Sequence, residues 1–273
     1  MPELPEVETT MRGLRRYLPG KTIAEVVVRD ARLRWPVPGE LPERLRGAAV
    51  EGLSRRAKYI LIQVTGGTLL LHLGMSGRVS MLTPEGARQV GPHDHVDIRL
   101  STGEVMRLTD PRRFGCLLWV EGAISEHPLL RHLGREPLEA GFDGDYLFAR
   151  SRGHRVAVKT FLMDAKVVVG VGNIYASEAL FAAQIRPLRA AGRISRQRYG
   201  RLADAVTVTL QAAIGAGGTT LRDFQDQDGQ LGYFSLQLAV YGRVGEHCTR
   251  CGGVIRSARV GQRSTFWCPR CQH

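Results

Sequence analysis

Residues 248–271 read CTRCGGVIRSARVGQRSTFWCPRC, and this stretch is the most specific structural signal in the chain. It contains two Cys-x-x-Cys pairs, Cys248 with Cys251 and Cys268 with Cys271, with 16 residues between them. Two knuckles at this spacing are typical of a zinc ion held by four thiolates. The residues between the pairs alternate in polarity on both sides of Gly261, which predicts two strands. We therefore expect a β-hairpin zinc finger with one Zn2+.

The alternatives for these cysteines are a redox pair, which would need only one Cys-x-x-Cys, and an iron–sulfur cluster. Four thiolates leave no open position for a catalytic water, so the zinc is expected to be structural. The fifth cysteine, Cys116, lies in the apolar run CLLWV and is expected to be a core residue. The sequence MPELPEVETT has no features of a secretory signal, which favours metal over disulfides and predicts a cytoplasmic, nucleoid-associated protein.

The formal net charge of the chain is +12, which favours a polyanionic partner such as nucleic acid. Residues 242–273 alone carry six arginines against one glutamate, as suits contact with phosphates or a DNA groove. Only four of the 38 basic residues are lysines, so each lysine is informative about chemistry that needs an amine. No apolar run approaches the ~18 residues of a membrane helix, so no membrane partner is expected.

Working outward from the finger, a glycine-rich stretch at 215–234 is expected to be a long functional loop. Helical periodicity precedes it at 173–185 and 198–214, and spaced apolar residues predict another helix near the N-terminus, ending before Pro19. Between these parts lie short β-rich runs at 22–28, 58–64, 68–73, 95–100, 104–108 and 116–120. Their turns predict a mostly antiparallel sandwich or barrel.

The fold class is therefore α+β, with three expected domains. Residues 1–130 would form a catalytic β-sandwich with an N-terminal helix. Residues 131–238 would form a helical DNA-binding domain, and residues 239–273 the zinc finger.

Eight motifs occur in order along the chain: MPELPEVE (1–8), RRAKYILI (55–62), LGMSGR (73–78), HDHVD (93–97), TDPRRFG (109–115), VGVGNIYASEALF (169–181), GGTTLRDF (217–224) and QRSTFWCPRCQ (262–272). Together they resemble the bacterial formamidopyrimidine-DNA glycosylases from Pro2 to the last residues. The resemblance implies a helix-two-turn-helix and a lesion-recognition loop in the helical domain. It also implies a monomeric enzyme of base excision repair that acts on double-stranded DNA with oxidised bases or abasic sites.

The same resemblance implies a bifunctional glycosylase and AP lyase that excises oxidised purines, namely 8-oxoguanine and formamidopyrimidines. After removal of Met1, the amine of Pro2 would attack the sugar C1′ and form a Schiff base. An α-amine titrates at about 7.7–8.0, so a usable neutral fraction exists near pH 7. Glu3 would protonate the opening sugar ring, Lys58 would assist elimination, and Arg263 would serve the second step of a β,δ-elimination.

The resemblance further implies that Met75, Arg112 and Phe114 fill the gap left by an extruded base. It gives DNA contacts to His93, Arg112, Arg155 and Asn173, and also to Lys159 and Tyr241. Asn173 follows a glycine-rich run just before a helix, where amides can hold a phosphate. Relatives often carry a lysine cluster where this chain has Gly153-His154-Arg155, so charge is thinner there.

Two other functions compete with this one. The sister enzyme endonuclease VIII shares the nucleophile and the finger but prefers oxidised pyrimidines. Leu4 and the stretch GGTTLRDFQDQDGQLGYF at 217–234 favour the purine enzyme. A catalytically silent zinc protein that only binds damaged DNA is disfavoured by the presence of Pro2, Glu3 and Lys58.

Overall fold

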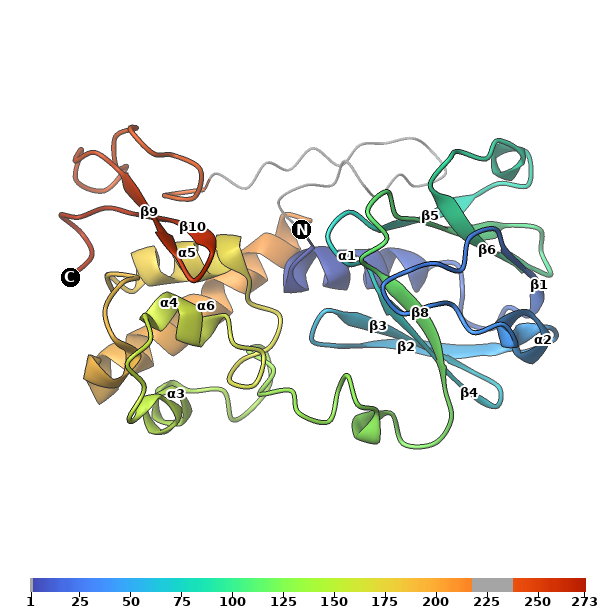
Figure 1. The fold of residues 1–273 in the computed structure, drawn as a ribbon, viewed down its shortest axis with the longest axis horizontal. Coiled ribbons are helices and arrows are strands. Elements are labelled where there is room, and N and C mark those ends of the chain that lie inside the picture. The colour runs from blue at the N-terminus through green and yellow to red at the C-terminus, as the bar shows by residue number, and fades with distance from the viewer. Residues whose placement is uncertain (1, 218–237) are drawn as a thin grey trace. The chain divides into compact units, whose positions relative to one another are not determined.

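A computed structural model describes residues 2–217 and 238–273 of the chain (Figure 1). The described residues divide into two compact units, the first comprising residues 2–131 and the second residues 132–216 with 238–273. The predicted lesion loop at 217–234 lies, apart from Gly217, outside the described residues.

The first unit begins with a helix and continues mainly as strands. Its elements are α1 (Leu4–Leu14), β1 (Ile23–Val28), α2 (Leu41–Leu45), β2 (Val50–Arg56), β3 (Tyr59–Val64), β4 (Gly67–His72), β5 (Arg78–Leu82), η1 (Gly86–Arg88), β6 (Asp94–Leu100), β7 (Val105–Thr109), β8 (Cys116–Val120) and η2 (Ile124–Glu126). One four-stranded sheet has the order β1-β6-β7-β5 and the other β2-β3-β4-β8. Every pairing between these strands is antiparallel.

One hydrophobic core contains side chains from both sheets and from α1. The unit is therefore a β-sandwich carrying an N-terminal helix, as predicted. Two strands were not predicted, β2 and β5, because their sequences VEGLSRR and RVSML are too polar or too short to stand out. The helix ends at Leu14, earlier than the apolar spacing indicated, although Leu18 is still buried in the same core.

The second unit is helical and carries the hairpin. Its elements are α3 (Gly144–Ser151), α4 (Val158–Leu162), α5 (Asn173–Ala182), η3 (Ala191–Arg193), α6 (Arg196–Gly215), β9 (Arg256–Val260) and β10 (Arg263–Trp267). Helix α5 is predominantly apolar and most of its length is buried, because α4, α6 and β10 all pack against it (Figure 1).

Two turns join α4 to α5 and produce the predicted helix-two-turn-helix. The first is closed by the Asp164 amide, which donates to the Phe161 carbonyl at 3.2 Å. The second is closed by the Val167 amide, which donates to the Asp164 carbonyl at 2.8 Å. None of the helices within 2–217 and 238–273 is long and apolar enough to cross a membrane.

Candidate functional site

Pro2 and Glu3 lie immediately before α1 in the first unit. Glu3 is only 1% exposed, whereas Pro2 is partly exposed. The carboxylate of Glu6 accepts the Glu3 amide at 2.8 Å and so caps the first turn of the helix. The Glu3 carboxylate accepts the Glu6 amide in return, so the two residues form a capping box that holds a buried carboxyl group next to the proline.

Lys58 lies in the tight turn between β2 and β3, next to Ala57, whose φ is 55°. Arg55 supports this turn by donating from Nη1 to the Ala57 carbonyl at 2.8 Å and from Nε to the Glu8 carboxylate at 2.9 Å. Burial would raise the pKa of Glu8, but hydrogen bonds from Arg55 and Arg12 outweigh it and lower that pKa. The ion pair therefore links the Lys58 turn to α1, the helix that begins beside Pro2.

His72 ends β4 opposite Tyr59, and its ring lies 4.8 Å from the Tyr59 ring. Burial first, and then the positive charges of Lys58 and Arg34, lower the pKa of His72 to about 4. The ring is therefore neutral at pH 7, and its Nδ1 accepts the Gly74 amide at 3.0 Å. This bond fixes the start of the turn that carries Met75.

Asp110 is fully buried and organises the loops around it. One of its carboxylate oxygens accepts from the Ser76 hydroxyl at 2.8 Å and the other accepts from the Gly115 amide at 2.8 Å. Its backbone amide donates to the His93 carbonyl at 3.0 Å. The loops that contain Met75, His93 and residues 111–115 are thus joined through one residue.

Phe114 and Arg112 extend from this loop cluster into solvent. The Phe114 side chain is 41% exposed, and the Arg112 guanidinium lies over its ring at 4.7 Å. Gly74 allows the neighbouring loop to approach, because a Cβ there would lie 2.4 Å from the Phe114 carbonyl carbon. Arg113 adopts a φ of 57°, unusual for a non-glycine residue, and forms an ion pair with Asp30 at 2.8 Å.

In the second unit Asn173 is the first residue of α5. Its Nδ2 donates to the Tyr241 hydroxyl at 3.4 Å, while its Oδ1 is buried without a hydrogen-bond partner. The carboxylate of Glu178, further along α5, accepts the amides of residues 239–241 at 2.7–3.0 Å. These bonds attach the chain leading into the finger to the helix whose N-terminus can bind an anion.

Arg155 is exposed in the segment between α3 and α4. Lys159, by contrast, is 1% exposed, and its Nζ donates to the Ser264 carbonyl at 3.1 Å and to Thr265 Oγ1 at 3.0 Å. Lys159 therefore joins α4 to β10, the strand that begins with the exposed Arg263.

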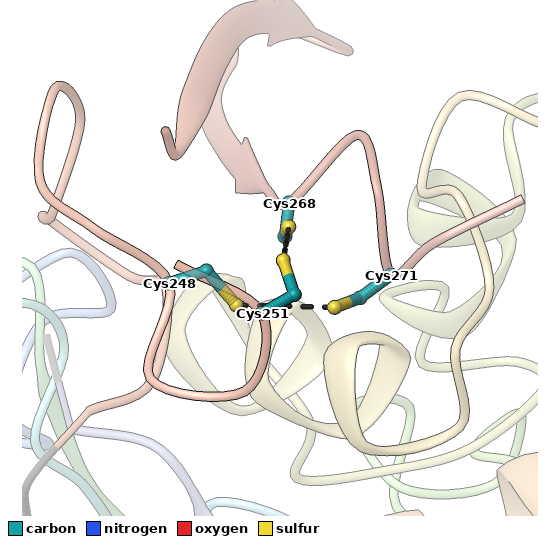
Figure 2. A group of neighbouring side chains, drawn as sticks. All are labelled: Cys248, Cys251, Cys268 and Cys271. Carbon is teal, nitrogen blue, oxygen red and sulfur yellow. Dashed lines mark hydrogen bonds between the residues drawn. The ribbon is translucent and has the colours of Figure 1, made fainter. Parts of the chain in front are cut away.

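The four finger cysteines converge on one centre (Figure 2). Their sulfur atoms all lie within 4.8 Å of one another, with 3.9 Å between Cys248 and Cys271 and 3.4 Å between Cys251 and Cys268. A tetrahedral site with Zn–S bonds of about 2.3 Å separates its sulfurs by about 3.8 Å, so the donor set fits one zinc ion. Three of the cysteines, Cys248, Cys268 and Cys271, also form a small core with Phe181 and Ile255.

Strands β9 and β10 pair antiparallel as predicted, and a two-residue turn joins them. Gly261 and Gln262 both have positive φ, 54° and 64°, as a tight hairpin turn requires. A cavity of about 540 Å³ lies between α4 and this turn, and its walls include His154, Asp164 and Arg263.

Comparison with known proteins places this geometry in a family. The N-terminal domain model of formamidopyrimidine-DNA glycosylase matches residues 1–117, its H2TH domain model matches 133–225, and the model of the zinc finger found in Fpg and IleRS matches 245–273. The chain belongs to the formamidopyrimidine-DNA glycosylase family. Two curated relatives named formamidopyrimidine-DNA glycosylase, from Syntrophotalea carbinolica and Halorhodospira halophila, are 56% and 58% identical over the whole of both chains.

Solved structures of family members have the same fold. The MutM (Fpg) protein from Thermus thermophilus has a TM-score of 0.86 at 38% identity, covering 99% of this chain and 98% of that one. The Lactococcus lactis Fpg in complex with DNA containing an abasic site has a TM-score of 0.89 at 30% identity, covering 99% of both chains. The predicted family, the glycosylase class, the α+β fold and the zinc finger are confirmed.

The structure groups the predicted residues of this glycosylase by unit. The first unit contains Pro2, Glu3, Lys58, His93 and the three residues predicted to fill the gap left by an extruded base, Met75, Arg112 and Phe114. The second unit contains Arg155, Asn173 and Arg263. Sequence reasoning missed the residues that hold them, chiefly Asp110, Arg55 and Glu178. Only Asp110 had a local signal, since an Asp-Pro pair favours a turn.

Proposed function

We propose that the chain is a bifunctional glycosylase and AP lyase that removes oxidised purines from double-stranded DNA through a Schiff base on Pro2. The observation that carries the proposal is the N-terminus of α1, where Pro2 adjoins a Glu3 carboxyl group that is 1% exposed and held in a capping box with Glu6. Family membership supplies the reaction class for this arrangement.

The first step uses the secondary amine of Pro2. Once Met1 is removed, the neutral nitrogen attacks C1′, the glycosidic bond breaks and the base leaves with its bonding electrons and a proton. Opening of the sugar ring, with Glu3 giving a proton to the ring oxygen, leaves an iminium between the proline nitrogen and C1′. The burial of Glu3 beside Pro2 and its fixed position in the capping box are consistent with this role.

The second step breaks the DNA backbone. The iminium acidifies the C2′ hydrogen, so its removal expels the 3′ phosphate, and Lys58 assists this β-elimination. Arg263 on the finger hairpin assists loss of the 5′ phosphate in the δ-elimination. The exposure of Arg263 and the ion-paired support of the Lys58 turn are consistent with both roles.

Base extrusion precedes the chemistry. Phe114 and Met75 would fill the vacated space and Arg112 would donate to the orphaned base. The loops bearing Met75 and Phe114 approach each other closely, and Arg112 stacks on Phe114. This arrangement supports a shared role of the three residues in filling the space left by the extruded base. His93, Arg155 and Asn173 would hold the backbone, Asn173 at the positive end of α5.

The substrate class distinguishes this proposal from the alternative, an endonuclease VIII that prefers oxidised pyrimidines. Structures of the Lactococcus lactis Fpg include complexes with Fapy-dG DNA and with DNA containing an oxidised pyrimidine. Leu4 and the stretch at 217–234 favour the purine enzyme, so we expect excision of 8-oxoguanine opposite cytosine to exceed excision of an oxidised pyrimidine. The two duplexes must be compared directly.

The test of the nucleophile is borohydride trapping on both duplexes by protein with an exposed Pro2 amine and by protein with one residue fused ahead of Pro2. An amide nitrogen has no available lone pair, so the blocked protein should bind abasic DNA yet form no trapped complex and cut no strand. Trapping that survives a verified block would identify a lysine as the nucleophile, and Lys58→Gln in the blocked background would then abolish it.

A further inference from the structure

One serine hydroxyl joins the two loops that carry Met75, Arg112 and Phe114, here called the gap-filling residues. Ser76 directly follows Met75, and its hydroxyl donates to the Asp110 carboxylate at 2.8 Å. The same hydroxyl oxygen accepts the Arg112 amide at 3.2 Å. A single group therefore connects the turn that carries the methionine to the loop that carries the arginine and the phenylalanine.

The backbone on both sides of this hydroxyl is fixed. The Asp110 amide donates to the His93 carbonyl at 3.0 Å, and the Asp110 carbonyl accepts a hydrogen bond from Nε2 of the buried His95 ring at 2.8 Å. In the other loop, the Gly77 amide donates to the Leu73 carbonyl at 2.8 Å and closes the turn. The hydroxyl thus attaches a closed turn to a residue that is itself held by its backbone.

The two loops also approach each other closely at two glycines. A Cβ at Gly74 would clash with the Phe114 carbonyl carbon, and a Cβ at Gly115 would lie 2.5 Å from the His72 carbonyl oxygen. Close packing of this kind brings the loops together but has no preferred direction. Hydrogen bonds are directional, so those of Ser76 can define how one loop is oriented on the other.

Filling a vacated base position requires several side chains to reach the same place. Phe114 is 41% exposed with Arg112 stacked on its ring, and Met75 is partly exposed on the adjoining turn. Side chains on independent loops would each lose conformational freedom on entering the duplex. Joining the loops before DNA binds reduces this cost, because the loops are then already ordered.

We propose that Ser76 is a positioning residue for base extrusion, and that its hydroxyl makes the gap-filling residues enter the duplex as one unit. This inference rests on the proposed function, because it takes these residues to occupy the space of the extruded base. Ser76 would act through them and not on the reacting atoms. Its loss should therefore slow removal of a damaged base more than cleavage of an abasic site.

The test compares single-turnover rates of Ser76→Ala on a duplex with 8-oxoguanine and on a preformed abasic site. Excision should slow about fivefold, the rate equivalent of one ordinary hydrogen bond, while abasic-site cleavage should change less than about twofold. Ser54→Ala is the matched control, because the Ser54 hydroxyl accepts a hydrogen bond from Gln63 at 2.7 Å in the same unit. Both of its rates should stay within about twofold of wild type.

Two further variants separate the hydroxyl from the size of the side chain. Ser76→Thr keeps the hydroxyl and should excise 8-oxoguanine at nearly the wild-type rate. Ser76→Val is β-branched in the same way but has no hydroxyl, so it should be as slow as Ser76→Ala. This pair gives the answer even if Ser76→Ala is unstable. Equal rates for the threonine and valine variants would overturn the proposal.

A double variant tests whether Ser76 acts through the gap-filling residues. Once Phe114→Ala has removed the ring, most of the benefit of positioning is lost, so adding Ser76→Ala should slow excision by less than about twofold. Effects that multiply in full would mean that the two residues act independently, and the proposal would be wrong.

Equal slowing by Ser76→Ala on both substrates, or equal slowing by Ser76→Ala and Ser54→Ala, would also overturn the proposal. Neither result would affect borohydride trapping by Pro2. Wild-type protein that excised no damaged base would instead contradict the proposed function itself.

Discussion

At the scale of single residues, the functional side chains depend on a few buried polar groups. Asp110 joins three loops through its carboxylate and its amide. Its partners Ser76 and His93 lie in other loops, and only Gly115 belongs to its own loop. Leaving such donors unpaired would cost about 1–3 kcal/mol each, which explains how short loops keep a defined shape. The exposed side chains at the tips of these loops are therefore held in defined positions.

Phe114→Ala should slow excision of 8-oxoguanine from a duplex by about tenfold or more, because base–aromatic stacking is worth about 1–3 kcal/mol. Cleavage of a preformed abasic site should change much less, since no damaged base needs to be extruded. Single-turnover rates on the two substrates make the comparison. Equal slowing on both would contradict a wedge role for Phe114.

His72 should make stability depend on pH in a defined window. Its pKa of about 4 in the folded protein lies below the value of about 6.5 in the unfolded chain. Between these values the unfolded chain binds more protons, so stability rises with pH and falls as pH drops from about 6.5 to about 4.

His72→Asn, which keeps an acceptor near the Gly74 amide, should remove this dependence. Wild type should lose about 2 kcal/mol more than the variant between pH 7 and pH 4.5, as measured by urea unfolding. An identical loss in both proteins would show that the stability change comes from other groups.

At the scale of elements, the finger is held by contacts that converge on α5. Glu178 accepts the amides of residues 239–241, and Phe181 packs with the cysteines in a small core. From α4, Lys159 donates to β10. The hairpin that carries Arg263 therefore depends on both the metal and the helices.

Cys268→Ser should abolish binding of the single zinc ion and, with it, DNA cleavage, because metal binding to such a module is coupled to its folding. Cys116→Ala is the matched control, since Cys116 is buried outside the metal centre and should leave zinc content unchanged. Metal analysis of both purified variants gives the result. Active wild-type protein without zinc would contradict the prediction.

At the scale of the whole molecule, the net charge of +12 is distributed over two units with separate hydrophobic cores. The finger and the helices form one compact unit, whereas the sequence suggested dividing them near residue 238. The division into three domains, 1–130, 131–238 and 239–273, stays a prediction.

Arg155→Gln should weaken binding about equally for all DNA sequences, as expected for a residue that contacts phosphate. The slope of log affinity against log salt concentration should fall by about one. Arg150→Gln is the control, because this exposed arginine lies on α3 in the same unit. A salt slope unchanged in Arg155→Gln would remove Arg155 from the DNA contacts.

The sequence by itself determined the zinc ligands, the finger hairpin, helices α5 and α6, and the family. Each of these depends on local spacing: the Cys-x-x-Cys knuckles, two strands separated by Gly261 and Gln262, and apolar residues at helical intervals. Local spacing reports reliably on contacts between residues that are near in the chain.

Only the tertiary structure decided the roles of Asp110, Arg55 and Lys159 and the presence of β2 and β5. Lys159 is the clearest case, because the family resemblance implied a DNA contact while the fold buries it against residues more than 100 positions away. Contacts between residues so far apart in the chain form when whole helices and strands pack together. The sequence around a polar residue has no periodic pattern that would identify such a distant partner.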